Sequence, residues 1–193
     1  DRHLSTRGDK TAILFEPNDP NEAAQHITYK QLHERVNQFA NVLKSQDIKK
    51  GDRVCIYLPM IPELAISVLA CARIGAIHSV VFAGFSSTAL STRINDSDCK
   101  MVITSDGSYR GAKTIDLKGI VDEALESCDC VETVLVAKRI KSKIQMKEGY
   151  NIRDFKKYTA KTILEKTQNE PESRREWMLE RFKKATETHS RNK

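Results

Sequence analysis

Apolar residues in the first part of the chain alternate between short continuous runs and longer segments in which they recur every three or four positions. Runs rich in Val and Ile predict buried strands, and helical spacing predicts amphipathic helices. We expect strands at 11–15, 53–58, 77–83, 100–104 and 131–137, and helices at 28–43, 63–74, 86–94 and 115–127. This alternation predicts an α/β fold with a doubly wound, mostly parallel sheet.

The predicted helices carry recognisable start and stop signals. Thr28 and Gln31 have the spacing of a capping box, in which each side chain satisfies the backbone amide of the other residue. Pro62 suits a first helical position, Gly75 a helix end and Ser86 a helix cap. Ligands of doubly wound sheets bind at loops beyond the carboxyl ends of the strands. The loops at 59–62, 84–86 and 105–113 are therefore the first places to look for a site.

The composition changes at about residue 149. Residues 149–193 hold 12 Lys and Arg against 7 Asp and Glu, and so carry most of the net charge of +6. The pattern of this segment predicts two basic amphipathic helices, at about 151–168 and 171–188. We therefore divide the chain into an α/β unit over 1–149 and a short basic helical tail over 150–193.

The five cysteines lie inside or beside apolar runs without regular spacing, which favours reduced thiols and a cytoplasmic protein. Cys128 and Cys130 form a Cys-x-Cys pair without a neighbouring histidine, and zinc sites need about four ligands, so we predict no metal site. No apolar run has the length of a membrane span and no secretion leader is visible. A start at Asp1 rather than Met suggests a fragment.

Six motifs over about residues 1–149 resemble those of AMP-forming acetyl-CoA synthetases, in the same order and at similar spacing. They are His26-Ile-Thr-Tyr-Lys-Gln-Leu-His33, Lys50-Gly-Asp-Arg53, Tyr57-Leu-Pro-Met-Ile-Pro-Glu63, His78-Ser-Val-Val-Phe-Ala-Gly-Phe-Ser86, Arg93-Ile-Asn-Asp-Ser-Asp-Cys-Lys100 and Asp122-Glu-Ala-Leu125. Phe82-Ala-Gly-Phe85 after a Val-Val strand favours short-chain acyl-CoA synthetases over luciferases or long-chain enzymes. The resemblance implies the first subdomain of the adenylate-forming fold.

The resemblance also implies a reaction for the full-length family. ATP and acetate, with magnesium, form acetyl-adenylate and pyrophosphate, and the thiol of coenzyme A then displaces AMP. The family's Ser-Gly-Ser-Thr-Gly-Lys phosphate loop does not occur in these residues, and its catalytic lysine domain lies further on. We therefore expect an inactive fragment of the ligase and name no catalytic residue.

One family site matches residues of this chain, the loop that contacts the phosphorylated nucleotide end of coenzyme A. Arg110 matches the first of two family arginines three residues apart, and Lys113 replaces the second. Arginine can bind a phosphate through two parallel hydrogen bonds, whereas lysine offers a point charge. The resemblance implies that Gly111 and Ala112 keep this loop small beside the nucleotide.

A weaker match places Ala83 and Gly84 beside the pantetheine arm of coenzyme A. From composition alone, Arg110 and Lys113 would be solvated loop charges, and the turn at 83–84 would serve packing. Part of the coenzyme A surface is thus expected here, either within a ligase fragment or in a stand-alone coenzyme A binder.

The tail is similar to part of the IS200-like, REP-associated tyrosine transposases, which cleave single-stranded DNA. Tyr158 could correspond to the tyrosine nucleophile of these transposases, but the chain has no His-hydrophobe-His motif to hold the metal. A basic helix with an aromatic residue can bind nucleic acid, and it can equally be a solvated charged face. The alternative hypothesis is therefore a chimeric protein that binds nucleic acid through its transposase-like tail. Such a chimera could come from a real gene fusion or from an error in sequence assembly.

Overall fold

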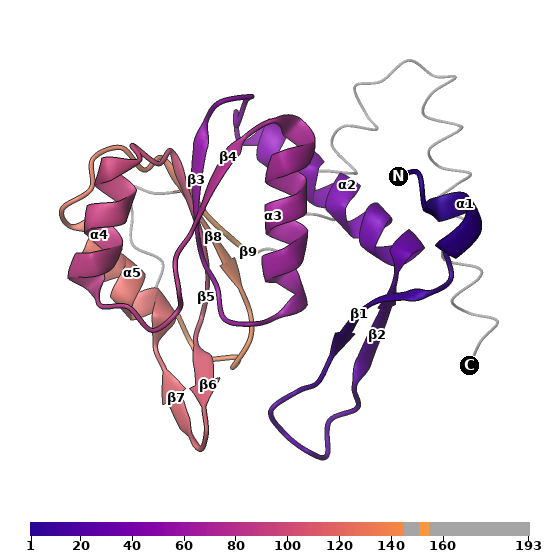
Figure 1. The fold of residues 1–193 in the computed structure, drawn as a ribbon. Coiled ribbons are helices and arrows are strands. Elements are labelled where there is room, and N and C mark those ends of the chain that lie inside the picture. The colour runs from indigo at the N-terminus through magenta and orange to yellow at the C-terminus, as the bar shows by residue number, and fades with distance from the viewer. Residues whose placement is uncertain (145–150, 155–193) are drawn as a thin grey trace.

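The computed structural model describes residues 1–144 and 151–154, and a five-stranded parallel sheet runs through its centre (Figure 1). The strand order is β4-β3-β5-β8-β9, and every neighbouring pair is parallel. The strands are β3 (Arg53–Tyr57), β4 (Ile77–Val80), β5 (Met101–Ser105), β8 (Thr133–Ala137) and β9 (Asn151–Asp154). The predicted α/β fold with a parallel sheet is confirmed.

Helices cover both faces of the sheet, so the sheet is doubly wound (Figure 1). They are α2 (Tyr29–Ser45), α3 (Pro62–Ile74), α4 (Ser87–Asp96) and α5 (Leu117–Leu125). Alternate side chains of a strand point to opposite faces. Val54 and Ile56 accordingly lie in a core cluster with α2 and α3, whereas Cys55 and Tyr57 lie in a second cluster with α4 and α5.

The expected helix signals form as the sequence indicates. The Thr28 and Gln31 side chains accept hydrogen bonds from each other's backbone amides, at 3.2 and 3.0 Å, which completes a capping box. Pro62 begins α3. Gly75 ends this helix at φ 76°, a left-handed conformation that glycine adopts without a Cβ penalty. The Ser86 side chain accepts a hydrogen bond from the Ala89 amide at the start of α4.

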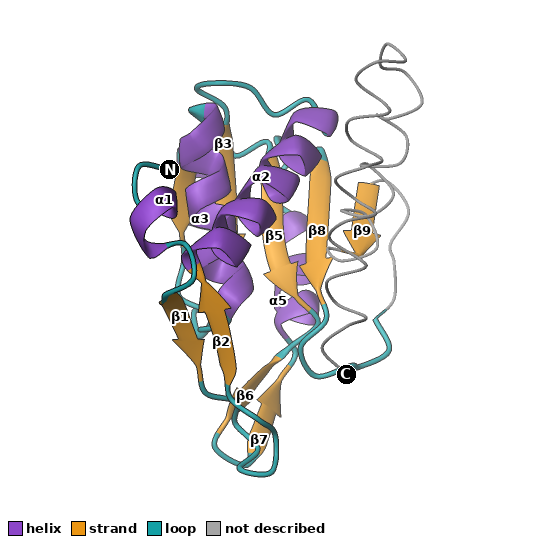
Figure 2. Ribbon diagram, turned by 90° about the vertical axis from the view of Figure 1, so that its right-hand side faces the viewer, coloured by secondary structure: helices purple, strands orange, loops and turns teal. Residues whose placement is uncertain are grey.

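Two antiparallel hairpins extend from the same end of the sheet (Figure 2). One is formed by β1 (Thr11–Phe15) and β2 (Gln25–Thr28), which follow a one-turn helix α1 (Leu4–Arg7). The other is formed by β6 (Ser108–Arg110) and β7 (Lys113–Ile115). The sequence pattern did not predict α1 or β2, and it assigned 106–113 to a loop because strands this short carry almost no periodic signal.

Two further expectations are corrected. The strand predicted at 77–83 as buried ends at Val80 and is an edge strand, with Ile77 exposed by 55%. A short apolar run looks the same whether one or both sides of the strand are covered. The helix predicted from residue 151 is replaced at Asn151–Asp154 by β9, which lies past the expected boundary at 149 in the same sheet. The remainder of the predicted tail helices, with Tyr158, lies outside the described residues.

In the part of the chain that the structure describes, no helix is long and apolar enough to cross a membrane.

Candidate functional site

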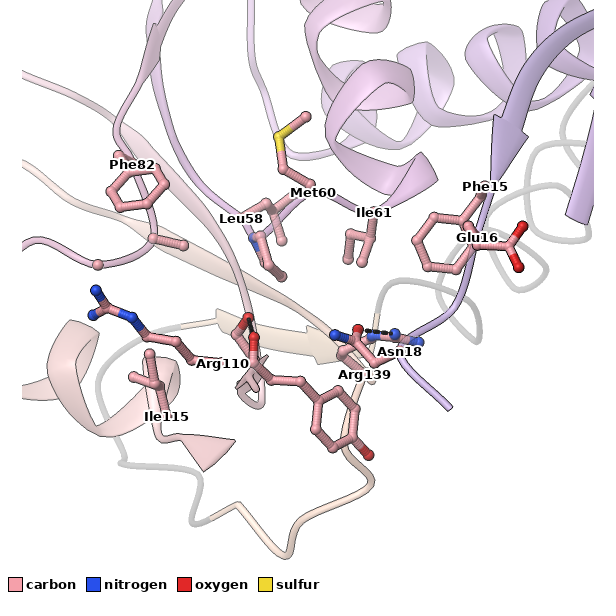
Figure 3. A pocket seen from close by; sticks show the side chains of 15 residues that line it. Phe15, Glu16, Asn18, Leu58, Met60, Ile61, Phe82, Arg110, Ile115 and Arg139 are labelled. Atoms are coloured by element: carbon pink, nitrogen blue, oxygen red, sulfur yellow. Dashed lines mark hydrogen bonds between the residues drawn. The ribbon is translucent and has the colours of Figure 1, made fainter. Parts of the chain in front are cut away.

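A cleft of about 390 Å³ lies beside the carboxyl end of the central sheet, between the two hairpins (Figure 3). The three loops expected to form a site all contribute to it. Together with the strand residues directly before them, these loops supply Leu58, Pro59, Met60, Ile61, Phe82, Ala83, Gly84, Ser108, Tyr109 and Arg110. The lining is completed by Phe15 at the end of β1, Glu16 and Asn18 in the loop after it, Ile115 at the end of β7, and Arg139 in the loop after β8. The sequence analysis did not identify this second group.

The buried side chain of Tyr57 anchors the turn at 82–86 through a hydrogen bond. Its hydroxyl donates a hydrogen bond of 2.8 Å to the carbonyl oxygen of Phe85. Burial, with a smaller contribution from the neighbouring thiol of Cys55, raises the pKa of Tyr57, so the hydroxyl keeps the proton that it donates. The Gly84 amide donates to the Phe82 carbonyl oxygen at 2.8 Å and closes the turn. Tyr57 therefore fixes the segment that presents Ala83 and Gly84 to the cleft.

The β6–β7 hairpin carries the predicted nucleotide-contacting residues. Gly111 has a φ of 61° at the first turn position, where a two-residue hairpin of type II′ takes glycine. Arg110 and Lys113 face each other across the two strands. Arg110 lines the cleft, whereas Gly111, Ala112 and Lys113 are exposed at the hairpin tip and are not part of the lining.

Of the six predicted site residues, the structure thus brings Arg110, Ala83 and Gly84 together in one cleft. A Cβ added at Gly84 would come within 2.6 Å of the Phe82 ring. Phe82 is 68% exposed and its ring can move aside, and Gly84 does not have a positive φ, so neither space nor backbone conformation strictly requires glycine at this position.

Arg139 is the site residue that the sequence analysis missed most clearly. Its guanidinium carbon lies 5.3 Å from the ring centroid of Phe15 and 5.3 Å from that of Tyr109. Its Nη2 atom donates a hydrogen bond of 2.8 Å to Oδ1 of Asn18. Its position in the sequence could have indicated it. Arg139 follows β8, whose carboxyl end lies beside that of β5, and ligands of such sheets bind beyond the carboxyl ends of the strands.

The backbone around Arg139 is anchored by Asp106, which follows β5 and is 1% exposed. Its Oδ1 atom accepts hydrogen bonds from the amides of Arg139 at 2.6 Å and Ile140 at 3.1 Å, and its Oδ2 atom accepts from Ser142 at 3.2 Å. These bonds satisfy a buried carboxylate with backbone donors. Asp106 therefore determines the path of the loop that begins with Arg139.

The cleft carries a cation at each end, with apolar side chains between them. Figure 3 places Arg110 beside Phe82 and Ile115 at one end, and Arg139 beside Asn18 at the other. Across residues 1–144, neither arginine forms an ion pair with a carboxylate, while Arg53 and Arg73 elsewhere pair with Asp98 and Asp1. Such a lining suits a ligand that has anionic groups and an apolar or planar part. The described residues contain no group of three or more His, Cys, Asp or Glu that could hold a metal.

The chain belongs to the AMP-binding enzyme family, whose profile matches residues 1–178. It is 59% identical over 152 residues to an acetyl-coenzyme A synthetase of Alkalilimnicola ehrlichii, which covers 79% of this chain and 23% of that protein. It is 53% identical over 173 residues to an acetyl-coenzyme A synthetase of Desulfatibacillum aliphaticivorans, covering 90% of this chain and 26% of that protein. The expected resemblance to acetyl-CoA synthetases is confirmed.

A solved structure has the same fold. The acetoacetyl-CoA synthetase of Streptomyces lividans matches with a TM-score of 0.74 and 24% sequence identity, over 82% of this chain and 24% of that one. The chain therefore has the fold of part of an adenylate-forming enzyme and spans about a quarter of the length of the relatives named here.

Proposed function

We propose that this chain is a part of an acetate–CoA ligase that contributes a partial coenzyme A surface and is inactive alone. Support comes from its identity to acetyl-coenzyme A synthetases, at 53–59% for the two relatives above. The observation that carries the proposal is the position of Arg110, which lines the same cleft as the Ala83–Gly84 turn. The family resemblance had assigned these residues to the two ends of one coenzyme molecule.

The cleft offers separate groups for separate parts of coenzyme A. The Arg110 guanidinium can bind a phosphate through two parallel hydrogen bonds. The small residues Ala83 and Gly84 leave room for a narrow arm, and the apolar side chains of Leu58 and Ile61 can cover its methylene and methyl groups. Lys113 lies opposite Arg110 on the exposed hairpin and adds positive charge for the approach of an anionic ligand.

Acetate, ATP and magnesium belong to the complete ligase in this proposal. Magnesium and ATP supply the activated phosphate that makes the acetyl group transferable. The residues described here offer no acidic cluster for the metal, and the 193 residues contain no Ser-Gly-Ser-Thr-Gly-Lys loop for the nucleotide. We therefore assign no adenylation step to this chain and expect no acetate-dependent exchange between ATP and pyrophosphate.

Calorimetric titration with coenzyme A tests the proposal. The wild-type chain should bind, and Arg110→Ala should weaken binding about tenfold, the loss expected for one charge-assisted contact. Arg35→Ala removes an exposed cation of α2 that is not in the cleft lining, and it should leave the affinity unchanged. Equal affinity of the wild-type and Arg110→Ala chains would refute the assignment of the surface. Acetate-dependent pyrophosphate exchange would refute the inactivity.

A second candidate function rests on the basic excess of 12 Lys and Arg against 7 Asp and Glu in residues 149–193. Under this reading the chain binds nucleic acid through its tail. Binding of single-stranded DNA that weakens steeply with salt, and that is lost when residues 155–193 are deleted, would support it. Absence of binding at low salt would remove it.

We further propose a cytoplasmic location, because Cys55, Cys71, Cys99, Cys128 and Cys130 are all free thiols.

A further inference from the structure

Arg139 is held in place before any ligand arrives. The three amide hydrogen bonds to the Asp106 carboxylate fix the backbone from Arg139 to Ser142. The rings of Phe15 and Tyr109 then flank the guanidinium, each centroid 5.3 Å from its central carbon. The side chain therefore loses little further freedom when an anion binds, and its aromatic neighbours displace part of its hydration.

The Arg139 side chain forms no ion pair within residues 1–144. Its side-chain hydrogen bond goes to the neutral amide oxygen of Asn18, and its ring contacts are also neutral. Glu16 lines the same end of the cleft, but it forms no ion pair with Arg139 in that part of the chain. A guanidinium has five N–H donors, so donors remain for an incoming oxyanion.

Arg110 and Arg139 lie at opposite ends of the cleft, with Leu58, Met60 and Ile61 between them (Figure 3). Two separated cations suit one ligand with two separated phosphate groups better than a ligand with one phosphate. A nucleoside that is phosphorylated on both its 3′ and 5′ sides is such a ligand, and the nucleotide part of coenzyme A belongs to this class.

We propose that Arg139 is a second phosphate-contacting residue of this cleft, so that Arg110 and Arg139 each bind a different phosphate of a nucleoside 3′,5′-bisphosphate. This inference rests on the proposed coenzyme A function and adds a specificity-determining residue to it. Asp106 acts through Arg139 as a positioning residue.

The test is a set of calorimetric titrations on the full chain with adenosine 3′,5′-bisphosphate, adenosine 5′-monophosphate and adenosine 3′-monophosphate. Arg139→Gln and Arg110→Gln should each weaken binding of the bisphosphate about tenfold, the loss expected for one charge-assisted contact. Each variant should weaken binding of one monophosphate and not of the other, and the affected monophosphate should differ between the two variants. Arg139→Lys should restore part of the affinity, since it keeps the charge without the planar fork.

Lys143→Gln is the matched control, because it removes the same charge from an exposed position of the same loop, outside the cleft lining. It should leave all three affinities unchanged. If the wild-type chain binds the bisphosphate and Arg139→Gln binds it equally well, Arg139 is not a phosphate contact. An equal loss for all three ligands would show that Arg139 only supports the shape of the cleft. If the wild-type chain does not bind the bisphosphate, the proposed coenzyme A surface fails and the inference fails with it.

Discussion

The hydroxyl of Tyr57, a fully buried residue at the end of β3, donates a hydrogen bond of 2.8 Å to the carbonyl oxygen of Phe85. Tyr57 packs among core residues of α4 and α5, so the bond connects the hydrophobic core directly to the turn at 82–86. Ala83 and Gly84 belong to that turn and line the cleft. The Tyr57 side chain therefore helps to position this part of the cleft lining.

Tyr57→Phe should lower the free energy of unfolding by about 1 kcal/mol, because it removes this bond and keeps the packed ring. Urea unfolding followed by circular dichroism measures the change. Tyr109→Phe is the matched control, since the Tyr109 side chain is 39% exposed and should tolerate the loss of its hydroxyl. Equal effects of the two substitutions would show that the Tyr57 hydroxyl contributes nothing specific.

Asp106→Ala should lower the free energy of unfolding by about 2 kcal/mol, because the amides of Arg139, Ile140 and Ser142 lose a charged acceptor. Because these amides hold the loop that carries Arg139, ligand affinity should fall as well. Asp129→Ala removes an exposed carboxylate and serves as the control in urea unfolding. Unchanged stability of Asp106→Ala would contradict the anchoring role of this carboxylate.

Stability should fall at alkaline pH, partly through Cys71. Burial raises the pKa of Cys71 from its ordinary value of 9.0 to about 12. Between these two values the unfolded chain releases a proton that the folded chain keeps, so this thiol's contribution is complete below pH 9.0 and is lost as the pH rises toward 12. The loss amounts to about 1.4 kcal/mol per pH unit for one such group.

The measurement is the free energy of unfolding between pH 8 and 11, compared for the wild-type chain and Cys71→Ala. Cys71→Ala should make the free energy of unfolding fall less steeply with rising pH, although the lost packing lowers that free energy at every pH. Burial likewise raises the pKa of Cys99, to about 11, so part of the slope should remain. Identical slopes in the two proteins would contradict the raised pKa of Cys71.

Glu16→Gln should strengthen the binding of phosphorylated ligands about threefold, because it removes a carboxylate that repels them at the Arg139 end of the cleft. The gain should shrink as salt is added, since the repulsion is screened. Glu22→Gln, an exposed change in the β1–β2 loop outside the cleft lining, is the control. Calorimetry with adenosine 3′,5′-bisphosphate measures both, and an unchanged or weaker affinity for Glu16→Gln would contradict the electrostatic account.

The sequence predicted four of the five strands of the parallel sheet, β3, β4, β5 and β8, and the four helices that cover it, because these elements have strong periodicity and clear ends. Thr28 with Gln31, and Gly75, are local signals whose meaning does not depend on distant residues. The edge position of Ile77 could not be predicted in this way, because it depends on which strand lies beside it. For β9, four residues were too few to separate a strand from the start of a basic helix.

The candidate site was predictable only where a motif or the end of a strand marked it. Arg110 and Gly84 could be found from a family resemblance and from the rule that ligands bind beyond the carboxyl ends of strands. Arg139 acquires its surroundings from Phe15 and Asn18, more than 120 positions away, through contacts that no local pattern encodes. Lys113 was expected in the site with Arg110, but the hairpin places it outside the cleft lining.

The most direct test of the central claim is to titrate the ¹⁵N-labelled chain with coenzyme A and record the amide chemical shifts by NMR. The account predicts saturable changes confined to residues that line the cleft, with the largest at Gly84 and Arg110 and smaller ones at Arg139. The α1–α2 surface around Leu4 and Leu32 should not respond. Changes centred on that surface or on residues 155–193, or no change at millimolar coenzyme A, would contradict the claim that this cleft is a coenzyme A surface.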